Sequence, residues 1–410
     1  MKDRLFRKDF TLLVLAQITS VLGSAILRFA LNLHILDITG RVDIFAMIFA
    51  LTEIPGILLA PFGGAIADRF SRKKIIVILD FISSALILLL FILLGLELAN
   101  IVVIAVFLVF LAVKGNMYQP TVMAAVPTMV SKEKLVQANG IVNGVKSISF
   151  MTGPILGGML FGFMGVHNLL AVTAAIIFIT AVMEIFIKIP FTKREMEGNL
   201  VATFIADLKK TFIYISKENP TVMKLLFISA PLNMLITPFY IIGTPFILRM
   251  VLQSSETQFG IGMAVAPLAG VIGAFTIGFF AKRMVLPRLY RYAALYTVMI
   301  LPMIFAVTPM ILDTGFWPPF IAYSVFGGAF IFVGTVMSIF VVSIIQKETP
   351  NESLGKVMAL VGTVSQIIQP LGLIIYGFLF EQFSAVVFVP IAIACFFGIF
   401  LTAATKKAIR

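Results

Sequence analysis

Long apolar segments alternate with short charged loops along almost the whole chain. A helix needs about 20 mainly apolar residues to cross the hydrocarbon core of a bilayer. The segments that meet this requirement are residues 10–36, 44–67, 75–95, 101–130, 136–163, 169–189, 222–248, 259–281, 292–312, 317–345, 354–380 and 386–405. The pattern therefore predicts an all-α membrane protein of twelve transmembrane helices.

The composition excludes a water-soluble fold. Hydrophobic residues make up 60% of the 410 residues and charged residues only 12%, and the mean hydropathy is +1.09. Soluble proteins carry roughly 25% charged and about 45–50% apolar residues. The bilayer must therefore be the main solvent, and the net charge of +12 reflects membrane orientation rather than nucleic-acid binding.

The positive charges fall almost entirely on one side of the predicted membrane. The opposite side holds only Arg41 and Arg249, whereas most of the 31 Lys and Arg residues lie near the two termini and in the loops at 69–74, 132–134, 188–217, 282–291 and 347–356. Short cytoplasmic loops carry such an excess of Lys and Arg. We therefore predict a multi-pass protein of the cell (inner) membrane with both termini in the cytoplasm.

The longest loop divides the chain into two parts with six predicted spans each. Within this loop one face of a helix would carry the apolar residues Phe204, Ile205, Leu208, Phe212 and Ile215. This pattern is typical of a helix that lies on a membrane surface. We predict an N-terminal six-helix bundle (1–190), a cytoplasmic linker with an amphipathic helix (191–220) and a C-terminal six-helix bundle (221–410).

The two halves carry similar short sequences in the same order. Gly-Ala-Ile-Ala-Asp-Arg at residues 64–69 corresponds to Gly-Phe-Phe-Ala-Lys-Arg at residues 278–283, and Thr-Val-Met at 121–123 recurs at 335–337 by the same offset. Two similar halves related by an axis along the membrane normal are a known transporter architecture. The repeats therefore favour a parallel duplication.

Two motifs resemble signatures of the major facilitator superfamily, a family of secondary transporters. Residues 64–73 resemble the family's loop signature Gly-x-Leu-Ala-Asp-Arg-x-Gly-Arg-Lys, with Ser71 where glycine is usual. Residues 153–158, Gly-Pro-Ile-Leu-Gly-Gly, resemble its antiporter signature, with Ser149 at the first glycine position. The whole chain also resembles the drug-efflux branch (macrolide efflux-like, drug:proton antiporter), through residues 24–27, 120–139, 354–357 and 370–372.

The resemblance implies the major facilitator fold and points to two groups of functional residues. The first is the gating loop of Gly64, Asp68, Arg69, Arg72 and Lys73. These charges either serve only to keep the loop in the cytoplasm, or they hold the cytoplasmic side shut, with Asp68 meeting the positive N-terminus of a neighbouring helix.

The second group is the antiporter-like helix motif of Gly153, Pro154, Gly157 and Gly158. Small residues at this spacing let helix backbones approach closely, and a proline bends a helix. The motif serves either ordinary tight packing or, as the resemblance implies, a bend that favours exchange over leak.

Four ionisable residues near the middle of predicted spans form the candidate proton and substrate site: Arg28, Glu53, Lys114 and Lys146. A charged side chain that faces lipid costs free energy, so each of these residues should face the interior of the bundle and pair with a polar or oppositely charged group. Glu53 is either a proton carrier or a permanent partner of Arg28. Lys114 either neutralises Glu53 or attracts an anionic substrate.

Two further groups of polar residues lie in predicted spans. Asp80 and Glu184 are expected near the inner surface, which their side chains could reach by snorkelling. The uncharged polar residues of the C-terminal half could line a substrate site or bond helices together, and they are Asn233, Thr237, Tyr240, Thr244, Tyr323, Ser324, Gln366 and Gln369.

No enzyme motif is visible. The two histidines, His34 and His167, lack metal-ligand spacing, and the chain has no phosphate-binding loop. We expect no enzymatic activity, no cofactor, no metal and no nucleic acid. The expected partners are a small-molecule substrate, protons and membrane lipids, and the chain is expected to be a monomer.

The leading hypothesis is proton-coupled export of amphipathic small molecules by alternating access. The alternatives are export of an organic anion or siderophore-like compound, or transport of a non-drug lipid or solute.

Overall fold

The computed structural model describes residues 6–131, 134–190, 200–281 and 284–409. Within these ranges the chain forms helices and no strand. This confirms the prediction of an all-α protein. Helices are expected here because a backbone in lipid must satisfy its own hydrogen bonds, and a helix does so within one segment.

The first six predicted spans lie in five helices. Their bounds are α1 Lys8–Thr39, α2 Val42–Arg69, α3 Arg72–Gly95, α4 Ile101–Met129 and α5 Leu135–Ile185. The helix α5 contains two predicted spans, which meet at Gly165. The backbone of Gly165 has a φ of 72°, a conformation that glycine adopts without steric cost.

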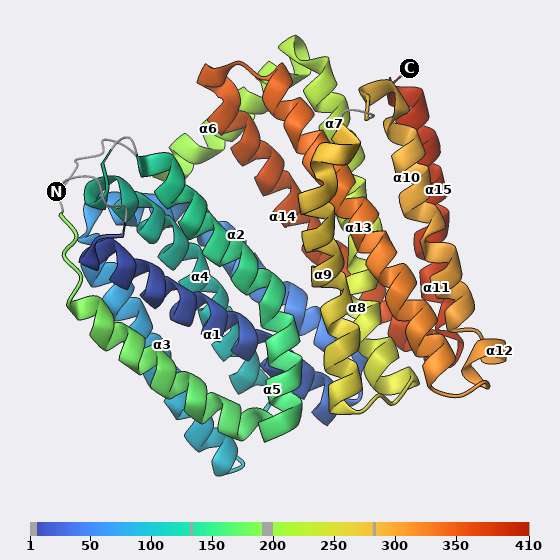
Figure 1. Cartoon of the computed structure of the whole chain (residues 1–410), viewed down its shortest axis with the longest axis horizontal. Helices are drawn as coiled ribbons and strands as arrows, with labels where there is room; N and C mark the ends of the chain where they lie inside the picture. The colour runs from blue at the N-terminus through green and yellow to red at the C-terminus, as the bar shows by residue number, and fades with distance from the viewer. Residues whose placement is uncertain (1–5, 132–133, 191–199, 282–283, 410) are drawn as a thin grey trace. The chain divides into compact units, whose positions relative to one another are not determined.

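The second half of the chain is more finely divided. Its elements are α6 Leu200–Glu218, α7 Pro220–Leu235, α8 Thr237–Phe246, η2 Ile247–Val251, α9 Glu256–Ala281, η3 Leu286–Arg288, α10 Leu289–Val298, α11 Ile300–Ala306, α12 Pro309–Leu312, α13 Trp317–Glu348, α14 Asn351–Gln382, η4 Ser384–Val386 and α15 Phe388–Ile409. Figure 1 shows these elements in chain order by colour.

The predicted seventh span is broken into α7, α8 and the π-helical turn η2. Pro238 has no backbone N–H and clashes with the turn before it, so the helix stops at Leu235 and restarts at Thr237. The carbonyl of Leu235 is satisfied from another helix, because the Tyr376 hydroxyl of α14 donates to it at 2.5 Å. A neighbouring helix thus repairs the break, as membrane helices require.

In the described residues, ten helical segments are long and apolar enough to cross a membrane. They do not include α2 or the first part of α5, which carry the predicted spans at 44–67 and 136–163. With these two added, the helices are consistent with the predicted twelve-helix fold.

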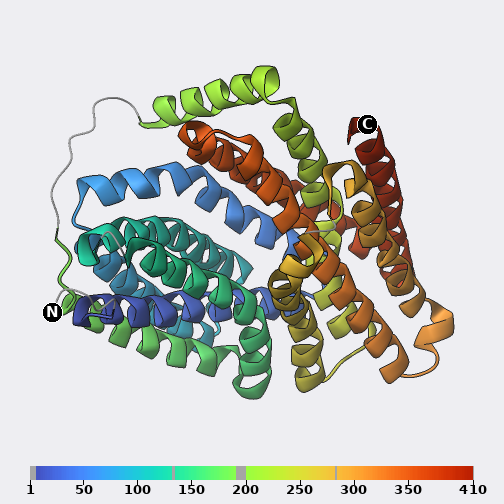
Figure 2. The ribbon, with the colours of Figure 1, turned by 45° about the horizontal axis from the view of Figure 1, so that its top comes forward.

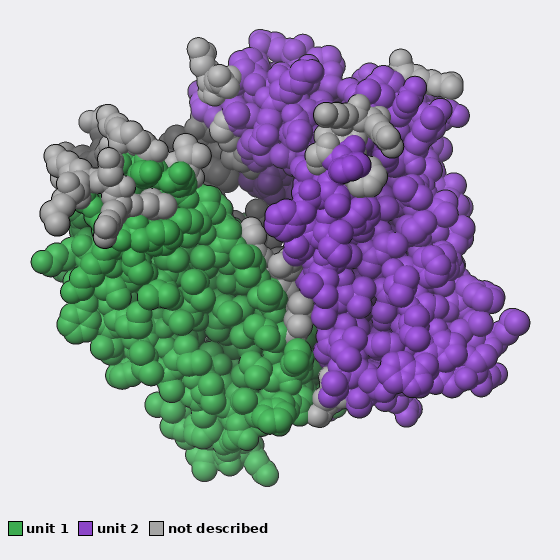
Figure 3. Space-filling view, viewed as in Figure 1, with its two compact units in different colours: residues 1–37, 51–204 green, residues 38–50, 205–410 purple. Residues whose placement is uncertain are grey.

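The chain divides into two compact units, which are drawn in different colours in Figure 3. The first unit comprises residues 1–37 and 51–204, and the second comprises residues 38–50 and 205–410. The division falls inside α6, an amphipathic helix that leads into α7 (Figure 2). Residues 191–199 of the predicted linker lie outside the described residues.

The interior of the first unit contains an apolar cluster toward one end and buried charged side chains of α3, α4 and α5. A buried cluster joins α1, α4 and α5 through side chains such as Phe10, Leu13, Val122 and Val142. The helices α3 and α5 pack along each other. This packing encloses the polar faces of α1, α3 and α4 and so positions the site described next.

Candidate functional site

A buried ion pair joins α3 to α4 inside the first unit. The Lys114 ammonium lies 2.8 Å from the Asp80 carboxylate, and both side chains are almost fully removed from solvent. Lys114 also donates to the hydroxyls of Ser20 at 3.0 Å and Ser24 at 3.2 Å on α1. Ser20 in turn donates to the same Asp80 oxygen at 2.8 Å. Three helices therefore hold this pair in a fixed network.

A second buried carboxyl lies in the same bundle. Glu184 on α5 is fully buried and accepts a hydrogen bond of 2.9 Å from the Tyr118 hydroxyl. The Lys114 ammonium is 5.7 Å from the centre of the Tyr118 ring. Among the described residues, the second oxygens of Asp80 and Glu184 have no hydrogen-bond partner. One buried cation therefore faces two buried carboxyls, and we call Asp80, Lys114, Tyr118 and Glu184 the charged cluster.

This arrangement corrects two expectations. Asp80 and Glu184 do not snorkel to the surface, because α1, α3, α4 and α5 enclose them. Lys114 does not neutralise Glu53, because it is bonded to Asp80 instead. A polar stripe in the sequence would have indicated the site, since Gln17, Ser20 and Ser24 recur at helical spacing on α1.

Glu53 is paired with Arg28 across α1 and α2. The two side chains are partly accessible, with exposed fractions of 29% and 25%. Lys146 on α5 is exposed. The structure thus brings together two of the four residues of the candidate proton and substrate site. Lys114 lies in the charged cluster, and Lys146 lies on the surface of the first unit.

The second unit contains a cavity of about 370 Å³. It is lined by apolar side chains and by the hydroxyl groups of Ser229, Thr237, Tyr296, Thr335, Ser338 and Ser365. None of the described residues that line it carries a charge. Such a mixture of apolar surface and a few hydroxyls suits an uncharged amphipathic group.

One residue that lines this cavity, Tyr296, is held by aromatic stacking. Its ring stacks on Phe330 with ring centres 4.1 Å apart, and Tyr240 also stacks on Phe330 at 5.8 Å. Gly334 makes room for the Tyr296 ring, because a Cβ atom there would lie 2.7 Å from it. Sequence reasoning missed Tyr296 because nothing in its local pattern differs from a packing residue.

The predicted polar residues of this half are distributed in several places. Thr237 lines the cavity, whereas Thr244 and Tyr323 share a buried hydrogen bond of 3.2 Å. Ser324 is buried next to Tyr323 on α13, and Gln369 is half-buried. The side chains of Asn233 and Gln366 lie outside the described part of the chain.

The sequence profile of the Major Facilitator Superfamily matches residues 13–373. The chain belongs to this superfamily. The match confirms the resemblance seen in the motifs, and it identifies the protein as a multi-pass membrane transporter of small molecules. The twelve-helix arrangement is the fold of that family.

Relatives within the superfamily include efflux proteins. The chain is 23% identical to Macrolide efflux protein A of Streptococcus pyogenes over 369 residues, which cover 88% of this chain and 86% of that protein. It is 26% identical to Multidrug resistance protein MdtG of Salmonella typhi over 271 residues, or 64% of this chain and 63% of the relative.

Solved structures of other transporters share the fold. A bacterial homologue of the iron transporter ferroportin in the inward-facing state has a TM-score of 0.70 at 18% identity and covers 98% of this chain and 99% of its own. The nucleoside transporter NupG has a TM-score of 0.71 at 13% identity and covers 98% of this chain and 100% of its own. At such identities the likeness concerns the fold alone.

The antiporter-like motif of the superfamily lies where α5 meets α1. A Cβ atom on Gly153 would lie 2.6 Å from the Ala25 side chain, and one on Gly157 would lie 2.8 Å from the Ile26 carbonyl. Gly158 is buried as well. The glycines therefore allow close backbone packing, and the side chain of Pro154 lies outside the described part. A role of this motif in preventing leak stays a prediction.

The loop signature of the superfamily connects α2 to α3. The helix α2 ends at Arg69, and α3 begins at Arg72. Arg72 and Lys73 are half-buried, whereas the side chains of Asp68 and Arg69 and the burial of Gly64 lie outside what the structure describes. The gating role of this loop stays a prediction.

On the other side of the predicted membrane, residues 38–50 pack on α14 within the second unit. The backbone N–H of Val42 donates to the Glu381 carboxylate at 2.9 Å. Arg41 lies 2.6 Å from Asp43 and 3.9 Å from Glu381. The hydrogen bond with Asp43 raises the pKa of Arg41 above its ordinary value. These contacts tie the loop after α1 to the end of α14.

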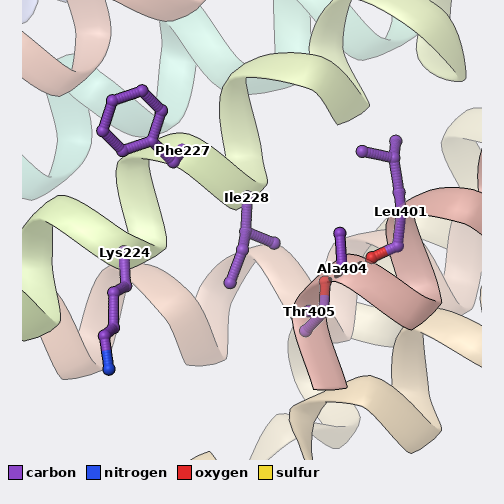
Figure 4. Close-up of a pocket in the computed structure, with 6 residues that line it drawn as sticks. All are labelled: Lys224, Phe227, Ile228, Leu401, Ala404 and Thr405. Atoms are coloured by element: carbon purple, nitrogen blue, oxygen red, sulfur yellow. Dashed lines mark hydrogen bonds between the residues drawn. The ribbon is translucent and has the colours of Figure 1, made fainter. Parts of the chain in front are cut away.

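A shallow groove of about 220 Å³ lies between α7 and α15. Figure 4 shows its lining residues, which are Lys224, Phe227, Ile228, Leu401, Ala404 and Thr405. Phe227 is mostly exposed on a helix that is apolar enough to span the membrane. The groove therefore belongs to the outer surface of the second unit and is distinct from the cavity lined by Tyr296.

Proposed function

We propose that this transporter exports amphipathic small molecules in exchange for protons, with both termini in the cytoplasm. The cavity of the second unit is the observation that carries the proposal. Its volume of about 370 Å³ falls within the roughly 300–1,000 Å³ of small-molecule sites. An apolar lining with scattered hydroxyls fits an uncharged or weakly polar group of a larger molecule. The names of the macrolide and multidrug efflux relatives support the same substrate class.

The alternative of an anionic substrate rested on Arg28, Lys114 and Lys146. Arg28 is paired with Glu53, and Lys114 is paired with Asp80. Two of the three cations are therefore already compensated by carboxylates of the protein. This leaves Lys146 as the one exposed cation of the set, so the charge argument favours an amphipathic substrate over an anionic one.

Purified protein in proteoliposomes tests the proposal. Erythromycin, the dye ethidium and a catecholate siderophore are offered as substrates, with and without an imposed pH gradient. We expect erythromycin or ethidium to be transported, to be driven by the pH gradient and to move protons in the opposite direction. Transport that is indifferent to the gradient would refute proton coupling, and transport of the siderophore alone would refute the substrate class.

A cavity-filling variant connects the result to the structure. Ser365 on α14 lines the cavity, so Ser365→Phe should lower the transport rate and raise the substrate concentration needed for half-maximal rate. Ile367→Phe places the same ring two residues away, where the side chain is exposed, and should transport normally. Equal transport by the two variants would mean that the cavity does not bind substrate.

A further inference from the structure

The charged cluster of the first unit has an excess of one acidic group. Asp80 and Glu184 are the acids and Lys114 is the base, and all three are buried. Burying an uncompensated charge costs several kcal/mol, because the group loses its hydration and gains no partner. One bound proton would make the cluster neutral. The composition of the cluster therefore fits a site that takes up a single proton.

The hydrogen bonds indicate which acid would hold that proton. Asp80 receives both the Lys114 ammonium and the Ser20 hydroxyl on one oxygen, so its negative charge is compensated. Glu184 receives only the Tyr118 hydroxyl. The charges of Asp80 and Lys114 act on Glu184 from a distance and oppose each other. The carboxyl without a bonded cation is the one that gains most from a proton.

The groups that face Glu184 come from three packed helices. They are Asp80 from α3, and Lys114 and Tyr118 from α4. The facing residues described on α1 are the uncharged Ser20 and Ser24, which bind Lys114. Farther along α1, Asp9 accepts a hydrogen bond from the Lys188 backbone beyond the end of α5. In the described residues Glu184 forms no salt bridge, and its second oxygen has no hydrogen-bond partner.

A polar path leads away from the cluster along α1. Gln17 lies one helical turn from Ser20, and its amide donates to Gln119 at 3.1 Å and to the Val142 carbonyl at 3.0 Å. Gln119 is half-buried. Side chains of this kind can carry hydrogen-bonded water when the helices separate. Polar side chains therefore lie between the cluster and the half-buried Gln119.

We propose that Glu184 of the charged cluster is the proton carrier of this transporter and that Glu53 is not. This inference rests on the proposed proton coupling. The protonated, neutral cluster suits the buried surroundings described above. Release of the proton to water leaves one net negative charge, which is tolerated only when water or Lys114 moves next to Glu184. Proton release is thereby linked to a change in the packing of α1, α4 and α5.

Glu53 lacks the features that this role requires. Among the described residues it forms a salt bridge with Arg28. Both side chains are also partly accessible. A carboxylate with a bonded cation is compensated without a proton, so neither pairing nor burial calls for proton uptake there.

Infrared difference spectroscopy on the full-length protein in lipid nanodiscs tests the assignment without any substrate. A protonated carboxyl has a C=O stretching band that shifts in D₂O and disappears as the pH is raised. We expect this band in the wild type, and we expect it to be missing in Glu184→Gln. It should persist in Glu53→Gln and in Glu97→Gln, a matched change on an exposed loop residue. A band that survives in Glu184→Gln would overturn the proposal.

Two further measurements keep the assignment separate from folding and from the proposed function. Tyr118→Phe keeps the carboxyl but removes its hydrogen-bond donor, so it should shift the band without abolishing it; an unchanged band would count against Glu184. In proteoliposomes, Glu184→Gln should lose erythromycin or ethidium transport driven by the pH gradient while it retains exchange of labelled for unlabelled substrate. If the wild type also ignores the gradient, proton coupling fails. If the wild type and Glu184→Gln both respond to the gradient, the assignment to Glu184 fails.

Discussion

Removal of one charge of the Asp80–Lys114 pair should destabilise the protein far more than removal of both. The two groups are 2.8 Å apart and almost fully buried. Loss of one partner from such a pair typically costs about 3–5 kcal/mol, because the other charge stays buried without compensation. Lys114→Met should show a loss of this size and Asp80→Asn a smaller one, because Glu184 remains to compensate Lys114, whereas the double variant should be close to the wild type.

The pH dependence of the two single variants should have opposite signs. Lys114→Met leaves two buried carboxyls, which become neutral when they bind protons, so its destabilisation should shrink as the pH is lowered. Asp80→Asn leaves Lys114 facing Glu184, which compensates the ammonium once it gives up its proton, so the destabilisation should shrink as the pH is raised. The free energy of unfolding can be followed by circular dichroism in mixed micelles over a range of pH.

A double-mutant cycle gives the refutation. If the loss in the double variant equals the sum of the two single losses, Asp80 and Lys114 do not interact. The exposed pair of Arg41 and Asp43 serves as the control, because screening by water makes the coupling of surface pairs small. A coupling between Arg41 and Asp43 as large as the buried one would mean that burial is not its cause.

Two further predictions concern packing. Gly157→Leu should destabilise the protein by about 1–3 kcal/mol in thermal unfolding, because the new side chain would meet the Ile26 carbonyl. Gly144→Leu on the same helix, where the space is open, should destabilise it much less. Equal losses would contradict the close approach of α5 and α1. Tyr376→Phe should cost about 1–3 kcal/mol because the Leu235 carbonyl loses its donor, and an unchanged unfolding temperature would show that the break between α7 and α8 is satisfied in another way.

The fold class could be predicted because it depends on chain-wide averages. Apolar segments of sufficient length force helices in lipid, whatever their neighbours are. The breaks within the helices were harder to place. Pro238 predicts a weak point in the seventh span, but whether the helix stops there depends on a donor such as Tyr376 on another helix. Local sequence carries no information on that donor.

For the candidate site, the sequence could indicate individual ionisable residues but not which of them pair with each other. The rule that an ionisable residue in a span needs a partner singled out Arg28, Glu53 and Lys114, each of which has an ionic partner in the structure. It could not assign Lys114 to Asp80, since the two residues lie on different helices and their distance depends on how those helices pack. The burial of Glu184 was missed for the same reason.

The sequence by itself therefore determined the class of solvent, the number of predicted spans, the repeated halves and the superfamily signatures, because each of these follows from composition or from residues close together in the chain. Only the tertiary structure decided which charges are paired and where a cavity remains. Pairing and burial are properties of the space between helices. Side-chain networks such as the one that joins Ser20, Asp80 and Lys114 bring together residues far apart in the chain, so their partners appear only once the helices are packed.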